Sequence, residues 1–247
     1  MSRSRTRKTL LGIWAHPDDE AYLSAGLMAL ARQRGDRVVV VTATAGELGT
    51  SEPDRWPPER LGALRRHELR ASLATLGVHE HQLLGFADGG CHRKDGTDLI
   101  AGVIRAVDPD TIVTFGPDGM TGHQDHRAVS AWTTAAWQQT TNRARLWYAT
   151  LTPGFHEAWG GVNDEIGLWA DNDEPPSVEP AHLACSLELS DRLLDQKLAA
   201  LRAHASQTTP LLSLLGEDTY REWWRTETFV DAVVHTALHA HPAKNAA

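Results

Sequence analysis

The chain has 247 residues, of which 41% are hydrophobic and 23% are charged. This composition is that of a soluble globular protein, and it excludes a collagen, a coiled coil and an intrinsically disordered chain. The formal net charge is −8, with 24 basic against 32 acidic side chains, so no overall electrostatic attraction draws the protein to nucleic acid or to an anionic membrane surface.

The two cysteines, Cys91 and Cys185, lie far apart in the sequence and form no CxxC pair. They offer neither a disulfide framework nor a thiolate zinc cluster, and we therefore expect a protein of the reducing cytoplasm. Near the N-terminus a basic stretch precedes a short apolar run at residues 10–15, which ends in charged residues rather than in a cleavage site. This pattern predicts a buried strand, not a signal peptide or a membrane span.

Apolar runs rich in β-branched residues alternate with longer amphipathic segments along the chain. The alternation is typical of parallel βαβ units and predicts an α/β fold with a mainly parallel sheet. The strands that it predicts are residues 9–14, 37–42, 82–85, 110–115, 145–150 and 183–189. The helices that it predicts are residues 18–34, 57–77, 97–107, a segment after residue 123 and residues 190–204.

Between residues 151 and 182 the alternation is lost in a polar stretch that contains glycine, proline and tryptophan. We expect long loops there, within one domain that spans residues 1–247. The late pair Trp223 and Trp224 is expected in a helical segment, and either in the core or at a subunit contact. A frayed tail is expected for the three histidines near the C-terminus, which are His235, His239 and His241.

Two polar motifs follow the first and fourth predicted strands. The sequence His-Pro-Asp-Asp-Glu occupies residues 16–20, and His-Gln-Asp-His occupies residues 123–126. Binding sites in α/β proteins lie at the carboxyl ends of the strands, near the point where the winding of the sheet reverses. If right-handed crossovers give the common strand order 3-2-1-4-5, the first and fourth strands are neighbours and the two motifs meet.

Each motif is also a good helix start, because proline at the first helical position and acidic residues suit the positive end of a helix dipole. Capping alone, however, requires neither His16 nor the pair His123 and His126 at the same crevice. We therefore favour a functional interpretation of the two motifs together.

The spacing within the motifs predicts a metal site. His16 and Asp19, three residues apart across a first helical turn, can face one point, and so can His123 and His126. Two imidazoles, one carboxylate and a water match the open coordination of a hydrolytic zinc site, and ligands without sulfur also admit Fe²⁺, Mn²⁺ or Co²⁺.

The remaining side chains of the motifs suit proton transfer. Asp18 or Glu20 could take a proton from metal-bound water, whose pKa is lowered towards about 7. A spare imidazole, which is His123 if His126 is the ligand, could stabilise an oxyanion or protonate a leaving amine. Asp125 could orient and charge that imidazole.

The two motifs, extended to residues 15–20 and 122–126, resemble those of the LmbE/PIG-L family of zinc-dependent deacetylases. Further matches are Gly46-Glu47, Arg65 with Glu68 before Leu76-Gly77, and residues 84–89 and 204–207, so the resemblance runs from about residue 9 to residue 207. The resemblance implies a Rossmann-like three-layer fold. It also implies a hydrolase that removes an acetyl group from an N-acetylglucosamine-type sugar or conjugate, with a small-molecule amino sugar as its partner.

The resemblance also implies roles for single residues. The metal ligands would be His16, Asp19 and His126. Asp18 would be the general base for attack of metal-bound water, and His123, held by Asp125, would stabilise the tetrahedral intermediate. Arg65 and Asp88 lie where relatives contact sugar or pendant groups, and Glu47 is a further candidate for substrate binding. Gln124 stands where proline is the commoner residue in the family, and we expect this departure to have little consequence. Residues 151–182 match no family motif, and because relatives diverge there, we expect this loop-rich region to determine the substrate.

Several alternatives stay open from the sequence. A sister enzyme would keep the site but cleave another amide, in a thiol or amino sugar conjugate. Two histidines and one carboxylate also describe the facial triad of non-haem Fe²⁺ oxygenases. A dinucleotide-binding module is disfavoured because no G-x-G-x-x-G follows the first strand. The sequence leaves a homo-oligomer open.

Overall fold

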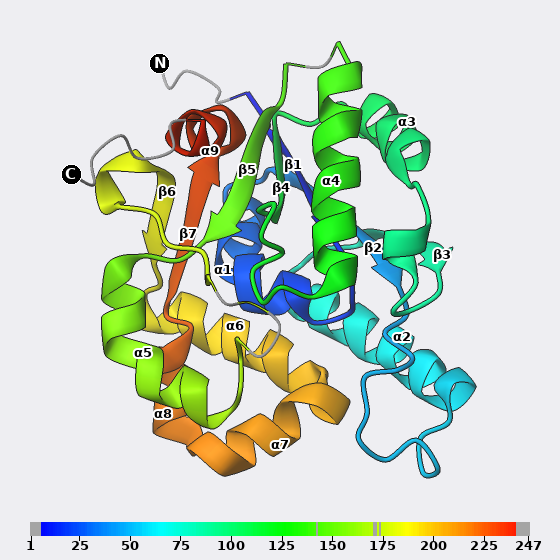
Figure 1. Ribbon diagram of the computed structural model, residues 1–247, viewed down its shortest axis with the longest axis vertical. Coiled ribbons are helices and arrows are strands. Elements are labelled where there is room, and N and C mark those ends of the chain that lie inside the picture. Colours follow the sequence, from blue (N-terminus) through cyan, green and yellow to red (C-terminus); the bar gives the residue numbers. More distant parts are fainter. Residues whose placement is uncertain (1–5, 142, 170–171, 173, 241–247) are drawn as a thin grey trace, which may run out of the picture.

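A seven-stranded sheet runs through the computed structural model, which describes residues 6–141, 143–169, 172 and 174–240. Its strands, in their order across the sheet, are β3 (Glu80–Phe86), β2 (Arg37–Thr44), β1 (Thr9–Trp14), β4 (Thr111–Phe115), β5 (Arg145–Thr150), β7 (Thr226–Asp231) and β6 (Leu183–Glu188). The first five strands pair in parallel, whereas β7 runs antiparallel to both β5 and β6 (Figure 1). The expected neighbourhood of β1 and β4 is therefore confirmed.

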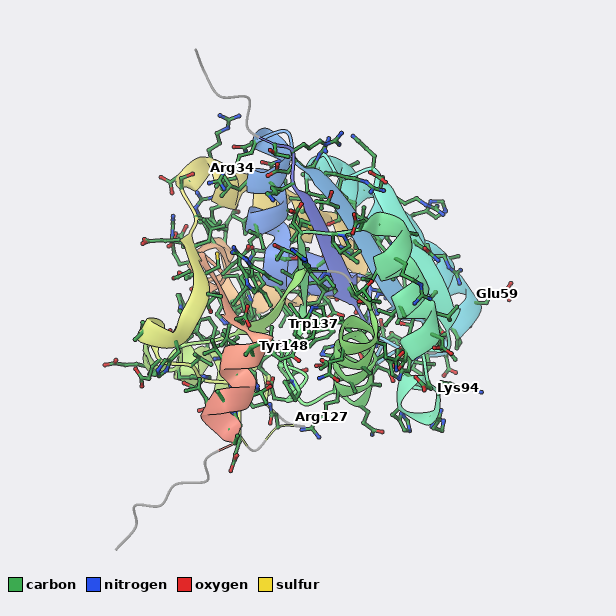
Figure 2. All side chains as sticks on the ribbon, turned by 90° about the horizontal axis from the view of Figure 1, so that it is seen from above. Arg34, Glu59, Lys94, Arg127, Trp137 and Tyr148 are labelled. Atoms are coloured by element: carbon green, nitrogen blue, oxygen red, sulfur yellow. The ribbon has the colours of Figure 1, made fainter. Side chains whose placement is uncertain are left out.

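Helices cover both faces of the sheet. On one face lie α1 (Asp19–Gln33), α2 (Pro58–Thr75) and α6 (Asp191–Ala203), and on the other lie α3 (Thr97–Val107) and α4 (Gln124–Gln139). The helix α9 (Ala232–His239) packs against β5 and β7. The view from above in Figure 2 shows the sheet between the two helical layers. The predicted α/β fold with three layers and a mainly parallel sheet is confirmed.

The central strands are buried on both faces. Every residue of β1 after Thr9 and every residue of β2 after Arg37 is buried, and this explains why these segments read as continuous apolar runs rather than as alternating ones. At the carboxyl ends of β1 and β4, the rings of Trp14 and Phe115 pack edge to face with centroids 5.0 Å apart. These two rings form an apolar floor beneath the loops that follow both strands.

The structure corrects the expectation for residues 151–182. Helix α5 (Pro153–Glu165) occupies the first half of this stretch, and a short 3-10 turn, η2 (Pro180–His182), closes it. The hydroxyl of Thr152 accepts from the Phe155 N–H and Pro153 begins the helix, which is an ordinary N-terminal signal. Three glycines inside α5, Gly154, Gly160 and Gly161, weaken the helical pattern in the sequence.

The C-terminal third contains elements that the alternation did not predict. These are helices α7 (Ala205–Leu215) and α8 (Glu217–Trp223), strand β7 and helix α9. In the first half of the chain, a 3-10 turn, η1 (Cys91–Arg93), follows β3. The expectation of a frayed tail is wrong for His235 and His239, which lie on α9 with their rings stacked 4.1 Å apart. His241 lies outside the described residues. Among the described helices, none is both long and apolar enough to span a bilayer.

A buried ion pair fixes α1 to the rest of the molecule. The carboxylate of Glu227 on β7 accepts from the backbone N–H groups of Gly26 and Leu27 inside α1, both at 2.8 Å. In a regular helix these groups donate to the carbonyls four residues earlier, so Glu227 competes with the helix for them. The ammonium of Lys197, on α6, donates to Glu227 at 2.9 Å and to the Tyr22 carbonyl at 2.7 Å. The middle of α1 is thereby fixed to β7 and α6.

Replacing Lys197 with alanine is expected to lower the free energy of unfolding by about 3–5 kcal/mol, because the Glu227 carboxylate is then left buried without its cation. Urea unfolding measures the loss. The control is Arg202→Ala, which removes an exposed ion pair with Glu217 and is expected to cost about 1 kcal/mol or less. Equal losses in the two variants would contradict this account of α1.

Candidate active site

The two polar motifs meet at the carboxyl ends of β1 and β4. His16 lies two residues beyond β1, and Asp19 begins α1. His123 is the N-cap of α4, and His126 lies in the first turn of that helix. Because β1 and β4 are hydrogen-bonded neighbours, residues more than a hundred positions apart in the chain lie in one crevice.

Three of the predicted ligand atoms converge. The Nδ1 atom of His16 lies 3.1 Å from Nε2 of His126. The Asp19 carboxylate brings Oδ1 within 3.4 Å of the His126 nitrogen and Oδ2 within 3.8 Å of the His16 nitrogen. Atoms that bind one zinc ion at about 2.0–2.2 Å lie about 3–3.5 Å apart, so the three side chains are close to the spacing of a shared ion.

The hydrogen bonds behind the two rings show which nitrogens carry lone pairs. His126 donates through Nδ1 to the Gly119 carbonyl at 2.9 Å. His16 faces Asp88 and Asp125 with Nε2, at 3.0 and 3.4 Å, and this nitrogen must donate because both partners are carboxylates. In the neutral rings, the two nitrogens that face each other are therefore both acceptors, and the Asp19 carboxylate is a third. Three acceptors that converge in this way fit a cation.

The electrostatics of the crevice favour positive charge at the same point. Burial lowers the pKa of His16, but hydrogen bonds to Asp125 and Asp88 and the charge of Asp19 outweigh burial and raise this pKa to about 10. Burial and the neighbouring His16 hold the pKa of His126 well below its usual value. The donor set of two imidazoles and one carboxylate suits Zn²⁺, and it also suits Fe²⁺, Mn²⁺ or Co²⁺.

Asp88 and Asp125 surround His16 as a second group of close ligand-type atoms, but their oxygens are already engaged. Asp125 accepts from the backbone N–H groups of Gly89 and Cys91, at 2.7 and 2.9 Å, and Asp88 accepts from the Leu48 N–H at 2.8 Å. Carboxylates in such positions orient the imidazole that they bind and set its tautomer. The Asp125 side chain thus contacts His16, whereas the sequence suggested that it would hold His123.

His123 is positioned through the main chain instead. Its Nδ1 accepts from the backbone N–H of Asp125 at 3.2 Å, so the proton of the neutral ring must lie on Nε2. Burial and the charge of His16 lower the pKa of His123, which favours the neutral ring. The ring stands edge-on to that of His16, with centroids 4.8 Å apart. His123 therefore presents a hydrogen-bond donor to the crevice.

Asp18 has a strained backbone. Its φ of 106° lies in the left-handed region, which costs a non-glycine residue of order 1–3 kcal/mol. The conformation is held by the Glu20 carboxylate, which accepts from the Asp18 N–H at 3.0 Å, and by Arg65, which donates to the Pro17 carbonyl at 2.5 Å. Burial raises the pKa of the Asp18 carboxyl to about 6, although Arg65 lowers it.

Glu20, the other acid that the sequence offered as a proton acceptor, is fully buried. One of its oxygens accepts from the Asp18 N–H, and the other lies 2.8 Å from Nε2 of His204 and 3.3 Å from the Ser72 hydroxyl. Glu20 therefore holds the backbone of Asp18 at the start of α1. Of the two acids, Asp18 is the one that faces the crevice.

The predicted substrate-binding residues also make contacts within the protein. Arg65 is only 4% exposed, and its guanidinium binds the Gly46 and Pro17 carbonyls and one Asp18 oxygen. Asp88 binds His16, and its own N–H donates to Glu47 at 3.0 Å. Arg65 and Asp88 thus hold other site residues rather than reach toward a ligand. The second carboxylate oxygen of Glu47 is buried and has no partner within the described part of the chain.

Two hollows flank these residues. The first, which we call the apolar cavity, has a volume of about 270 Å³ and contains Asp18, Asp19 and His126 at its polar end. Its walls come from Tyr22 and Leu23 of α1, from Leu168, from Leu211 of α7 and from Trp223 and Trp224. The second, the polar hollow, has about 280 Å³ and is lined by Gly89, Gly122, His123, Gln124 and Arg127. Arg127 reaches the molecular surface in Figure 2.

The sequence did not indicate the cavity walls. Leu168 falls within residues 151–182, where we expected loops that determine the substrate, but Leu211 follows a proline inside α7 and carries no motif. Trp223 and Trp224, expected in the core or at a subunit contact, are buried and line the cavity. Two adjacent tryptophans are the only signal in the sequence that could have pointed to this wall.

Known proteins resemble the chain in both sequence and fold. The model of the PIG-L family, described as GlcNAc-PI de-N-acetylase, matches residues 11–137, which are 127 of the 247 residues. A 1D-myo-inositol 2-acetamido-2-deoxy-alpha-D-glucopyranoside deacetylase of Acidothermus cellulolyticus is 33% identical, over 81% of this chain and 80% of the relative.

Two solved structures share the fold. The N,N'-diacetylchitobiose deacetylase from Pyrococcus horikoshii has a TM-score of 0.62 at 21% identity, with 96% of this chain and 88% of that one covered. A triple mutant of a deacetylase from the teicoplanin biosynthetic pathway has a TM-score of 0.67 at 21% identity, with 92% and 97% covered.

Zn²⁺ added to chelator-treated protein at about 100 times its Kd is expected to raise the free energy of unfolding by about 2.7 kcal/mol, because the ion binds the folded state. Urea unfolding with and without Zn²⁺ measures the gain. Asp19→Ala should abolish it, and the control His235→Ala should retain it. A gain that survives Asp19→Ala but is lost in His235→Ala would place the ion on α9.

Proposed function

Because the chain belongs to the PIG-L family of de-N-acetylases, we propose that it is a metal-dependent hydrolase that removes the acetyl group from an N-acetylglucosamine-type sugar or sugar conjugate. One observation carries this proposal: the acceptor atoms of His16, Asp19 and His126 converge within 3.8 Å of one another, with Asp18 beside them. The relatives' names supply the substrate class, a small-molecule amino sugar.

The chain's own residues would hold the ion through Nδ1 of His16, Nε2 of His126 and the Asp19 carboxylate. When bound, a divalent ion polarises an amide carbonyl and makes water acidic enough to attack near neutral pH. We propose zinc, with Fe²⁺, Mn²⁺ and Co²⁺ as alternatives, because the donors are imidazoles and a carboxylate without sulfur.

Asp18 is the proposed general base. It lines the apolar cavity beside Asp19 and His126, and its pKa of about 6 leaves it ionised at neutral pH while keeping it basic enough to accept a proton from water. Arg65 contacts one Asp18 oxygen at 3.2 Å, which fixes the carboxylate and leaves its other oxygen for that proton.

His123 is the proposed donor to the developing oxyanion. Its Nδ1 is occupied by the Asp125 N–H, so the neutral ring offers Nε2–H, and a positioned donor of this kind stabilises a tetrahedral intermediate. The departing amine receives the proton that Asp18 has taken from water, while the neutral His123 keeps its proton and remains a hydrogen-bond donor. Asp125 acts on both histidines, through its carboxylate on His16 and through its N–H on His123.

The amidase that the sequence leaves open, which cleaves another amide, would use the same residues at the scissile bond. It would differ from a deacetylase in the group that the apolar cavity accommodates.

We further propose that residues 1–247 form one domain that acts in the cytoplasm, because Cys91 and Cys185 are both free thiols.

Asp18→Asn is expected to lower kcat by about 10²–10⁴-fold, the range of a general base, while it retains one ion per chain. His16→Ala should lose both the ion and the activity. Acetate release from N-acetylglucosaminides and metal analysis by mass spectrometry check the two expectations. Wild-type turnover in Asp18→Asn would overturn its assignment as the base.

Arg65→Met is expected to lower kcat by at least about tenfold with KM nearly unchanged, because a misplaced base weakens the transition state but not ground-state binding. Arg66→Met, at the adjacent exposed position, is the matched control and should leave both constants unchanged. A raised KM with unchanged kcat would instead restore Arg65 as a substrate contact.

A further inference from the structure

The two hollows that flank the site differ in chemistry although they are similar in volume. Asp18, Asp19 and His126 open onto the apolar cavity, whereas His123 opens onto the polar hollow. Neither hollow shares a lining residue with the other. A substrate whose scissile bond lies between Asp18 and His123 therefore has one part directed toward each hollow.

The proposed function sets the direction of the amide, and the inference rests on it. The amine part of the substrate carries the sugar hydroxyls, so it lies on the side of the polar hollow, whose lining offers hydrogen-bond partners. The carbonyl carbon lies beside Asp18 and the convergent acceptor atoms. The group attached to that carbon is then directed away from His123, into the apolar cavity.

The polar groups of the two hollows agree with this direction. Sugar hydroxyls need hydrogen-bond partners, and a buried hydroxyl without one costs about 1–3 kcal/mol. His123, Gln124 and Arg127 offer such partners in the polar hollow. Gln124 and Arg127 are exposed on the first turn of α4, so a bulky amine part can extend from the hollow to solvent.

The walls of the apolar cavity offer few free polar groups. The Tyr22 hydroxyl is bonded to that of Tyr220 at 2.9 Å. The Gln207 amide nitrogen donates to the Gly49 carbonyl and to the Ser206 hydroxyl, at 3.1 and 3.0 Å. The Thr121 hydroxyl contacts His126 at 3.5 Å. Among the described residues of the lining, the indole N–H of Trp224 is buried and has no hydrogen-bond partner. Apart from this group and its acidic end, the cavity suits a hydrocarbon group.

The cavity is also much larger than an acetyl group requires. A volume of about 10–15 Å³ measured in this way holds one water, and a methyl group is about as large as a water. The apolar cavity measures about 270 Å³. Its far walls, Leu168, Leu211 and Trp223, come from three separate segments of the chain, and an acetyl methyl at the convergent acceptors leaves most of this space unfilled.

We propose that the apolar cavity binds the acyl part of the substrate, and that the enzyme hydrolyses N-acyl amino sugars whose acyl group is a hydrocarbon chain of several carbons. Water adds to the amide carbon, the carbon–nitrogen bond breaks, and the proton that Asp18 takes from water passes to the amine. The products are a fatty carboxylate and the free amino sugar.

The first test compares the N-acetyl, N-propanoyl, N-butanoyl and N-hexanoyl derivatives of glucosamine with metal-loaded wild-type enzyme, by release of the free amine. We expect kcat/KM to rise with each added methylene, by up to about fourfold. A value that falls from acetyl to hexanoyl overturns the inference and leaves the proposed deacetylase standing. Failure to cleave any of these amides, and N-acetylated sugar conjugates as well, would overturn the proposed function itself.

The second test narrows the cavity. Leu211→Trp fills it from α7, and we expect the ratio of kcat/KM for hexanoyl over acetyl substrate to fall by at least about tenfold, since the added ring displaces the chain. Leu214→Trp is the matched control, because Leu214 lies one turn away on the same helix, is 57% exposed and is outside the cavity lining. Its ratio should stay at the wild-type value, and an equal fall in both variants would overturn the inference.

A third measurement separates acyl binding from binding of an apolar aglycone. The Asp18→Asn variant is titrated with N-hexanoylglucosamine and with the hexyl glycoside of N-acetylglucosamine, with calorimetry as the readout. The proposal expects the N-hexanoyl compound to bind more tightly, and Leu211→Trp in the same background to weaken only that compound. Tighter binding of the hexyl glycoside, weakened by Leu211→Trp, would assign the cavity to the aglycone.

Discussion

The arrangement of this site depends on two imidazole nitrogens that face each other at 3.1 Å with a carboxylate beside them. With both rings neutral the facing lone pairs would repel, and the raised pKa of His16 instead places a positive charge at this point. Each ring is also held by hydrogen bonds on its far side. The Gly119 carbonyl holds His126, and the pair Asp88 and Asp125 holds His16. These hydrogen bonds leave Nδ1 of His16 and Nε2 of His126 facing each other, and the surrounding carboxylates make the centre of the crevice attract positive charge.

A second set of contacts keeps the opening of α1 in an unfavourable conformation. The backbone of Asp18 is in the left-handed region. The Glu20 carboxylate accepts from the Asp18 N–H, and Arg65 donates to the Pro17 carbonyl, and these two bonds hold the loop. Further along α1, Glu227 and Lys197 anchor the helix to β7 and α6. Strain at a site residue with rigid support around it is what a preorganised general base requires.

The sequence predicted those parts of the molecule that depend on local pattern. The five parallel strands, their order and the meeting of the two motifs follow from apolar runs and from the handedness of crossovers. The partners of Asp125, Arg65 and Asp88 could not be predicted, because these side chains bind groups that only tertiary folding brings near. Strand β7 pairs antiparallel between β5 and β6, and no local signal predicts that a strand returns to the sheet there after three intervening helices.

The residues proposed for the reaction and the far walls of the apolar cavity come from different parts of the chain. Every side chain proposed to act on the scissile bond lies between residues 16 and 126, whereas the far walls of the apolar cavity come from Leu168, Leu211 and Trp223. The residues proposed to act on the scissile bond and the residues of these far walls therefore lie in consecutive segments of the chain. Mutation or recombination downstream of α4 can change what the protein accepts while its reactive groups stay untouched, which gives such a scaffold an easy route to new substrates.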